Sequence, residues 1–529
     1  MVRSRFLFGV AASLIGIGAF AHDEDGDKAA QKVGKVNFAN SCSAQVKVKV
    51  QRGVAMLHSF WWPEGERTFQ EIAAEDPACA AIAAWGFASI LMYNPFVGGT
   101  PPKDIARAQT AIEKGRQMGA KTEREKEYLE AVAAYWEDYA NRSERQRAVA
   151  RSKAYQALAA KYPKDDEAQI FNALYLIAIQ ERSDQTYSDS LKAAAILEKQ
   201  FAKYPNHPGV AHYLIHAYDA PPVAQKGLSS AKRYASIAPA APHALHMPSH
   251  IFTRVGAWQD SAATNRRSAD VALKGNEGDD ALHALDYIVY ADLQLGRDSE
   301  ARKTYEEAAR ITPSTPRFVG PYPLAAMPAR LAVERGAWRE AAQLQATPSK
   351  FPFTEALTYQ ARAIGAARNG DAAAAKADVE QIAKRRDALR EAKNEYWATE
   401  VEVMRLSAAA WTTFAENRAD EALGLMREAA DLEDRNEKHP VTPGRILPAR
   451  EQLGDLLMEL KRPAEALKEY EQSQKREPDR FRGLYGAALA AEMAGDAKTA
   501  RRYYTRLVQV AGKGEPRAEL TLARNYLEQ

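Results

Sequence analysis

Small and aromatic residues recur at fixed intervals along this chain. In residues 291–313, ADLQLGRDSEARKTYEEAARITP, the residues Gly296, Ala301, Tyr305, Ala308 and Pro313 have the spacing G-x4-A-x3-Y-x2-A-x4-P. Residues three and four apart share one helix face, so these small and aromatic side chains form a stripe. A proline cannot continue the helix, because it lacks the backbone donor. The pattern predicts a helix that packs its stripe against a close neighbour and ends at the proline.

The same pattern returns in other parts of the chain. Copies contain Phe69 and Pro77; Ala466, Tyr470 and Pro478; and Gly495, Ala500 and Tyr504. This motif resembles the second half of a tetratricopeptide repeat (TPR), a pair of antiparallel helices. The resemblance implies an all-α, TPR-like α-solenoid of roughly nine or ten helical hairpins over residues 51–529, consistent with a period of about 34 residues.

Segments rich in proline and glycine interrupt the repeats. They cover residues 94–104, 217–227, 312–323 and 436–448. Such segments are typical of loops, and we expect them to wall the groove of the solenoid. Residues 22–50 form an N-terminal lead-in before the array. Within it and just beyond, AQVKVKVQ (44–51) alternates like a strand but is equally compatible with an irregular segment.

The N-terminus has the pattern of an export signal. Residues 1–21 contain two arginines, an apolar run and the ending Ala19-Phe20-Ala21, which together predict a cleaved signal peptide and a periplasmic or secreted protein. A retained membrane anchor is the alternative. No later stretch is long and apolar enough to span a membrane. The net charge is +3 with acids and bases interspersed, which argues against nucleic acid as the partner.

The chain has two cysteines, Cys42 and Cys79. In an exported protein they can form a persistent disulfide, and we expect this bond to link the N-terminal segment to the first helical hairpin. Two unpaired thiols are the alternative.

Histidines follow the repeat register. Three of the ten histidines lie in HALHMPSHIF (243–252). Taking Gly256 and Gly296 as equivalent turns aligns His243, His246 and His250 with His283, Asp286 and Tyr290, while His212 and His216 lie 34 residues before His246 and His250. Pro248 predicts a kink in the helix between His246 and His250.

In the TPR family these positions of the first helix face the concave groove. The resemblance therefore predicts a histidine-rich groove over residues 207–290. The groove set is His212, His216, Asp219, His243, His246, His250, His283 and Asp286. The alternative is that these histidines are ordinary surface or core residues, but scattered surface histidines would not keep the register.

Two kinds of chemistry fit this arrangement. Two neutral imidazoles at i and i+4 can bind one transition metal, such as Zn, Cu, Fe or Ni, and a neighbouring helix can add another ligand. We expect the metal ligands to be His212, His216, His246, His250 and Asp286. Without a metal, the groove can hold a peptide, protein or small ligand through His58, Asp219, His243, Arg254, His283 and Tyr290, and respond to pH.

Other motifs of chemistry are absent from the sequence. HExxH does not occur, so a zincin general base is missing, and no CxxCH indicates covalent haem. The sequence contains no phosphate-binding glycine loop, the motif that would indicate a nucleotide cofactor. Glu451 and Asp455 occupy the stripe positions of His246 and His250, where a solvated acidic face is the simpler interpretation. His439 lies in a loop from which it can cap the groove.

The secreted start, LHSFWW, HYLIHAYD, HALHMPSHIF and KHPVTPG together resemble a group of exported bacterial TPR proteins without an established activity. A fold does not determine function. The sequence favours a binding protein that holds a peptide, protein or small ligand in a histidine-rich groove together with a transition metal. The alternative is a metal-dependent enzyme, a hydrolase or oxygenase, that uses the same histidines and aspartates.

Overall fold

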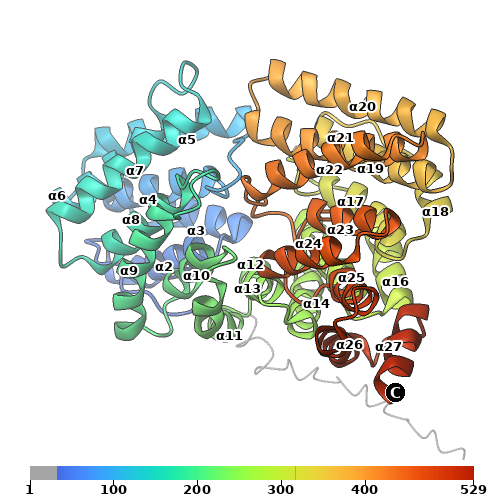
Figure 1. The fold of residues 1–529 in the computed structure, drawn as a ribbon. Coiled ribbons are helices and arrows are strands. Elements are labelled where there is room, and N and C mark those ends of the chain that lie inside the picture. Colours follow the sequence, from blue (N-terminus) through green and yellow to red (C-terminus); the bar gives the residue numbers. More distant parts are fainter. Residues whose placement is uncertain (1–31, 316) are drawn as a thin grey trace, which may run out of the picture.

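The computed structural model describes residues 32–315 and 317–529, and within this part the regular structure is entirely helical (Figure 1). The predicted signal peptide, residues 1–21, lies outside the described residues. Among the helices described here, none has both the length and the apolar character that crossing a bilayer requires.

The helices follow one another as antiparallel neighbours. In the first half they are α2 (Ala44–His58), α3 (Trp62–Glu75), η1 (Pro77–Cys79), α4 (Ala80–Leu91), α5 (Pro102–Met118), α6 (Glu123–Trp136), α7 (Glu144–Lys161), α8 (Asp166–Ala178), α9 (Ser188–Lys203), α10 (Pro208–Tyr218), η2 (Ala224–Gly227), α11 (Leu228–Ile237), α12 (Pro242–His246) and α13 (Pro248–Arg254). In the second half they are α14 (Trp258–Lys274), α15 (Gly278–Gln294), α16 (Asp298–Ala308), α17 (Pro321–Glu334), α18 (Trp338–Ala342), α19 (Pro352–Arg368), α20 (Ala372–Glu391), α21 (Glu395–Ala415), α22 (Ala419–Asp434), α23 (Ala449–Glu459), α24 (Pro463–Arg476), α25 (Phe481–Met493), α26 (Ala497–Ala511) and α27 (Ala518–Glu528).

The repeat register predicted from the sequence is confirmed at its turns. Gly256, Gly296 and Gly336 each join two helices and have positive φ values of 71°, 66° and 62°. A side chain is disfavoured in this left-handed conformation, which explains the glycine at all three turns. In α16, the stripe residues Ala301 and Ala308 are fully buried. The helix pairs therefore form a TPR-like solenoid, as expected.

The kink predicted at Pro248 is also present, because α12 ends at His246 and α13 begins at Pro248. The strand-like alternation in residues 44–51 is misleading. This segment forms the first two turns of α2, in which Val46, Val50 and Val54 lie on one buried face at intervals of four residues. The intervening valine, Val48, is 73% exposed and does not contribute to a core.

The solenoid closes on itself at its C-terminal end. Helix α25 contacts α15, Trp258 donates a hydrogen bond from Nε1 to the Asp479 carbonyl at 2.7 Å, and Arg517 pairs with Asp298 through Nε at 3.1 Å. Figure 1 shows the N-terminal helices on one side, the C-terminal helices on the other, and α12 and α13 between them. The helices that carry the histidines therefore lie where the two halves meet.

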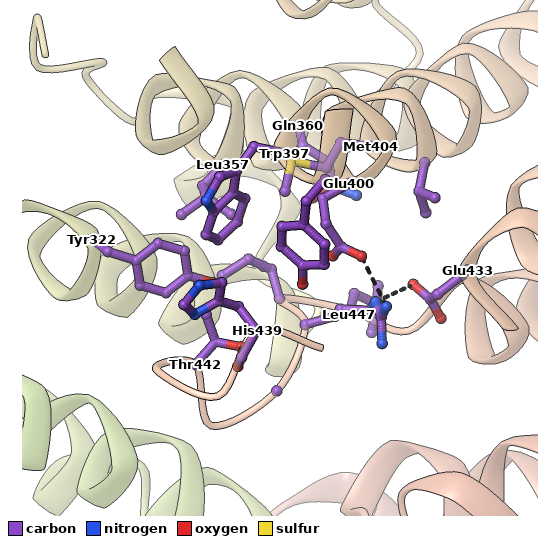
Figure 2. A pocket seen from close by; sticks show the side chains of 15 residues that line it. Tyr322, Leu357, Gln360, Trp397, Glu400, Met404, Glu433, His439, Thr442 and Leu447 are labelled. Carbon is purple, nitrogen blue, oxygen red and sulfur yellow. Dashed lines mark hydrogen bonds and ion pairs between the residues drawn. The ribbon is translucent and has the colours of Figure 1, made fainter. Parts of the chain in front are cut away.

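Residues 436–448 form an irregular segment, here named the capping segment, that is anchored to the C-terminal half. His439 stacks on Trp397 with ring centroids 5.3 Å apart, and Arg445 pairs with Glu400 at 3.0 Å and Glu433 at 3.3 Å (Figure 2). The backbone of the segment receives hydrogen bonds from Arg330 at Arg445 and Gly444. Its other side faces the histidines.

The two cysteines form a disulfide-compatible pair. The Cα atoms of Cys42 and Cys79 lie 5.0 Å apart, within the range of protein disulfides. A bond between them links the start of α2 to the N-terminus of α4 through η1.

Candidate metal centre

Six of the predicted groove histidines converge in two groups of three. The first triad consists of His212 and His216 from α10 and His243 from α12. Nε2 of His212 lies 3.1 Å from Nε2 of His216 and 3.1 Å from Nε2 of His243. His212 is fully buried, whereas the other two are partly exposed.

The second triad consists of His246 from α12, His250 from α13 and His283 from α15. All three are buried. The Nε2 atoms of His246 and His250 lie 3.0 Å apart, and the ring centroids of His246 and His283 are 4.2 Å apart. In each triad the ligand atoms lie within 4.8 Å of one another.

The two triads are the same site built twice by the repeat. Each takes an i, i+4 pair from one repeat and a third histidine from the start of the next repeat's first helix. The triads are adjacent, since the ring centroids of His216 and His250 are 5.7 Å apart and those of His243 and His246 are 6.0 Å apart. We call the space between the six imidazoles the histidine chamber.

Hydrogen bonds outside the chamber fix the tautomers of three histidines. Nδ1 of His212 lies 2.7 Å from the carbonyl oxygen of His58, and Nδ1 of His250 lies 2.9 Å from Oδ2 of Asp219. Both partners only accept, so Nδ1 carries the proton in each ring. Nδ1 of His246 lies 2.7 Å from Oδ1 of Asn265, whose amide nitrogen donates to the Ser261 carbonyl. The bare Nε2 of each neutral ring therefore faces the chamber.

This arrangement places two lone pairs against each other in the second triad. With both protons on Nδ1, the Nε2 atoms of His246 and His250 have no hydrogen to share across their 3.0 Å separation. Only a cation between or beside them makes this contact favourable. A proton is disfavoured there, because burial and the neighbouring imidazoles lower the pKa of His246 well below its usual value. The two nitrogens can instead be ligands of a metal ion, for which neutral imidazole is the ligand form.

A carboxylate orients the second triad from behind. Burial opposes ionisation of Asp219, but Lys438 and Arg254 hold its pKa well below the usual range, so it is a carboxylate. It accepts from His250 Nδ1 at 2.9 Å and from Arg254 Nε at 2.8 Å, and Lys438 Nζ lies 3.5 Å away. Metal-binding histidines commonly have such a partner on the far ring nitrogen. Asp219 and Arg254 thus support the site from outside it.

The capping segment closes the groove over the histidines. Tyr287, which contacts the second triad, donates to the carbonyl oxygen of Thr442 at 3.2 Å, and Glu437 pairs with Arg254 at 3.4 Å. The sequence predicted a loop that caps the groove, but Lys438 rather than His439 reaches toward the histidines. A cavity of about 80 Å³ remains at the edge, lined by residues that include His216, Asp219, Arg254 and Lys438.

Two predicted groove residues, Asp286 and Tyr290, lie away from the triads. Arg330 Nε is 3.6 Å from Asp286 Oδ1, and burial raises the pKa of Asp286 to about 6. The Tyr290 hydroxyl accepts from Arg480 at 2.6 Å and donates to Glu477 at 3.1 Å. The two positions that align with His246 and His250 thus join a network of charged side chains instead.

His58 also lies outside the chamber, although its carbonyl oxygen orients His212. Its ring contacts Glu167 at 2.9 Å and Tyr213 at 2.9 Å, and His207 contacts the other oxygen of Glu167 at 2.9 Å. His58, Glu167 and His207 can also hold a metal, but their polar atoms already bond to one another. Glu451, for which a solvated face was the simpler interpretation, is fully buried and bonded to Arg480 at 2.8 Å.

Comparisons with known proteins identify no relative in sequence. No protein-family model matches the chain, and no curated protein matches it. Matches among solved structures include a chain from "Crystal structure of APC/C hetero-tetramer Cut9-Hcn1", at 11% identity and a TM-score of 0.29, with 92% of this chain and 96% of that chain covered. TPR-like solenoids in general are typical of proteins that bind other proteins or peptides.

Proposed function

We propose that the protein binds transition metal ions in the histidine chamber and is a metal-dependent enzyme that acts on a small molecule. The observation that carries the proposal is the contact between the bare Nε2 atoms of His246 and His250 at 3.0 Å, each fixed from behind by a hydrogen bond at Nδ1. Zn, Cu, Fe and Ni all accept imidazole ligands.

The enclosure of the chamber favours an enzyme. Three protein ligands leave a coordination position open on an ion, as catalytic metal sites do. The capping segment occupies the groove over the triads, and the cavity beside His216 measures about 80 Å³. That space admits water or a small molecule and excludes a peptide from the metal. The reaction class is that of an oxygenase or a hydrolase.

A binding protein is the second candidate, favoured by the TPR-like solenoid. In this case the metal stabilises the closed groove, and a protein or peptide binds to another surface of the array. The two candidates differ in one measurement: exogenous small anions such as azide change the spectrum of a metal with an open position, and leave unchanged a metal whose coordination is complete.

Export to the periplasm or beyond is part of the proposal. Support comes from the signal-like sequence of residues 1–21 and from the disulfide-compatible geometry of Cys42 and Cys79. Mass spectrometry of the protein from its native host tests this, with a mature N-terminus near His22 expected. An intact Met1 in the purified protein would contradict cleavage of a signal peptide.

The metal proposal is tested by elemental analysis. Wild-type protein loaded with Zn, Cu, Fe or Ni in turn should retain at least one of them, and the double variant His246→Ala/His250→Ala should not. Asp286→Asn is the matched control, because this buried acid lies in the same helix as His283 but in neither triad. Circular dichroism should show equal helical content in all three. Wild type that retains no more metal than the double variant would end the proposal.

A further inference from the structure

The two triads are separate, equivalent and adjacent, and we infer that the chamber holds two copper ions, one in each triad, which together bind dioxygen. This inference rests on the proposed metal function and specifies the number of ions, the element and the ligand.

The number of ions follows from the grouping of the nitrogens. Each triad gathers its own three ligand atoms within 4.8 Å. Across the two triads, the ring centroids of His216 and His250 lie 5.7 Å apart and those of His243 and His246 lie 6.0 Å apart. One ion cannot use all six imidazoles and still leave a position open, whereas one ion in each triad keeps three ligands and an open position. Since each triad combines a pair from one repeat with a histidine from the next, three successive repeats form two equivalent sites.

The element follows from the ligand type and the surrounding charge. Within the described part of the chain, neither triad includes a carboxylate. Paired iron or manganese ions in helical proteins are typically held by several glutamates, and single non-haem iron by two histidines and a carboxylate. Six neutral imidazoles compensate no charge, and the nearby carboxylates of Asp219 and Glu437 already pair with Arg254 and Lys438. Two singly charged Cu(I) ions carry half the charge of two divalent ions, so they fit this neutral chamber best.

The assignment of dioxygen as the ligand follows from the pairing of the two copper ions and from the small space beside them. Two Cu(I) ions can each give one electron to O2, which becomes peroxide held between two Cu(II) ions, so the electrons balance without another reductant or a proton. The cavity beside His216 is small, at about 80 Å³. On the inner side, Phe96 packs on His216 and Phe60 stacks on His243, with centroids 4.1 Å and 5.1 Å apart. A diatomic molecule is small enough for this cavity, which is lined by Phe96 and His216 together with charged side chains such as Asp219, Arg254 and Lys438.

The test uses the full-length protein loaded anaerobically with Cu(I). We expect two copper ions per chain, and on exposure to O2 an intense near-ultraviolet band without a Cu(II) electron paramagnetic resonance signal, because the two Cu(II) spins couple through the peroxide. His216→Ala and His283→Ala each remove one ligand from a different triad. Each variant should hold about half the copper, lose the band and show the resonance of a single Cu(II) after oxidation. Asp286→Asn should behave as wild type.

The outcomes separate this inference from the proposed metal function. One ion per chain, two uncoupled Cu(II) signals, or two zinc ions retained in preference to copper would each overturn the inference while leaving the metal function in place. Two copper ions that do not respond to O2 would overturn the dioxygen assignment. If no metal is retained above the level of His246→Ala/His250→Ala, the proposed function itself fails. A variant that does not fold is replaced by His216→Gln or His283→Gln.

Discussion

The inner stripe of the solenoid has two very different regions at equivalent repeat positions. In the histidine chamber, the positions before Gly256 are His246 and His250. At the next two turns, the same positions are Asp286 and Tyr290, then Ala326 and Arg330. There the stripe forms an ionic cluster, which we define as Asp286, Tyr290, Arg330, Glu334, Glu451 and Arg480.

The ionic cluster supplies its own partners at its centre. Arg480 is fully buried and donates to Glu451 at 2.8 Å, Glu334 at 2.6 Å and Tyr290 at 2.6 Å. In the chamber, by contrast, the bare Nε2 atoms of His246 and His250 face each other without a hydrogen between them. The comparison teaches that burial of polar groups alone does not mark a functional site. What distinguishes the chamber is that hydrogen bonds to groups outside it hold His212, His246 and His250 with Nε2 pointing inward.

The largest effect is expected from Arg480→Ala in the ionic cluster. Removing one partner of a buried ion pair typically costs about 3–5 kcal/mol, because it leaves Glu334 and Glu451 buried without compensation. Denaturant unfolding should show this loss in the free energy of unfolding. The folded fraction should keep its metal. Loss of metal without loss of stability would reverse the assignment of the two regions.

A comparable stability loss is expected at a site that touches neither region. Cys42→Ser/Cys79→Ser opens a loop with a sequence separation of 37 residues, which should cost about 3–4 kcal/mol through the entropy of the unfolded chain. Thermal unfolding measures the change, and thiol titration of denatured, unreduced wild type should find no free thiol. Unchanged metal content in the variant would show that lower stability does not by itself empty the chamber. Two reactive thiols in wild type would contradict the disulfide.

A smaller effect is expected from Asp219→Asn, behind the second triad. Loss of the carboxylate that orients His250 should weaken metal affinity by about 10–100-fold, as is usual for such outer partners. Competition with a chelator of known affinity measures this. An affinity equal to that of wild type would show that Asp219 serves Arg254 and Lys438 alone.

The smallest effect is expected from Asp286→Asn, which makes the same chemical change in the ionic cluster. Neither carboxylate oxygen of Asp286 has a hydrogen-bond partner, and burial raises its pKa to about 6. Metal affinity should equal that of wild type in the same competition assay. Because a raised acid pKa costs stability as pH rises through it, the variant should be at least as stable at pH 7. A drop in metal affinity matching that of Asp219→Asn would place Asp286 among the ligands, as the sequence had indicated.

The sequence predicts the solenoid and the histidine stripe because both depend on local spacing. The turn glycines and the small and aromatic residues of each hairpin appear at fixed intervals, so the register can be counted. The pairs His212–His216 and His246–His250 are visible for the same reason. In contrast, the alternation of valine with polar residues in residues 44–51 does not mark a strand. Only the packing of α2 shows which of these valines are buried.

The composition of each triad cannot be predicted from the same spacing. His243 and His283 join the pairs of the preceding repeat, because adjacent helices offset their faces by an amount that depends on packing and loop length. Asp286 shares a helix with His283, yet it faces Arg330. Lys438 reaches Asp219 across more than two hundred residues of sequence, a contact that no local pattern contains. Long-range closure of the solenoid therefore decides which groups lie beside the triads.

The capping segment covers the histidine chamber and limits which solutes can reach it. The cavity of about 80 Å³ beside Lys438 and His216 has room for a diatomic gas, whereas a chelator is larger than this space. We expect a chelator to reach the histidines only after the contacts of Glu437 with Arg254 and of Thr442 with Tyr287 break. The residence time of an ion bound there would then depend on the opening rate of this segment, so chelators should strip the folded, metal-loaded protein slowly even where equilibrium favours them.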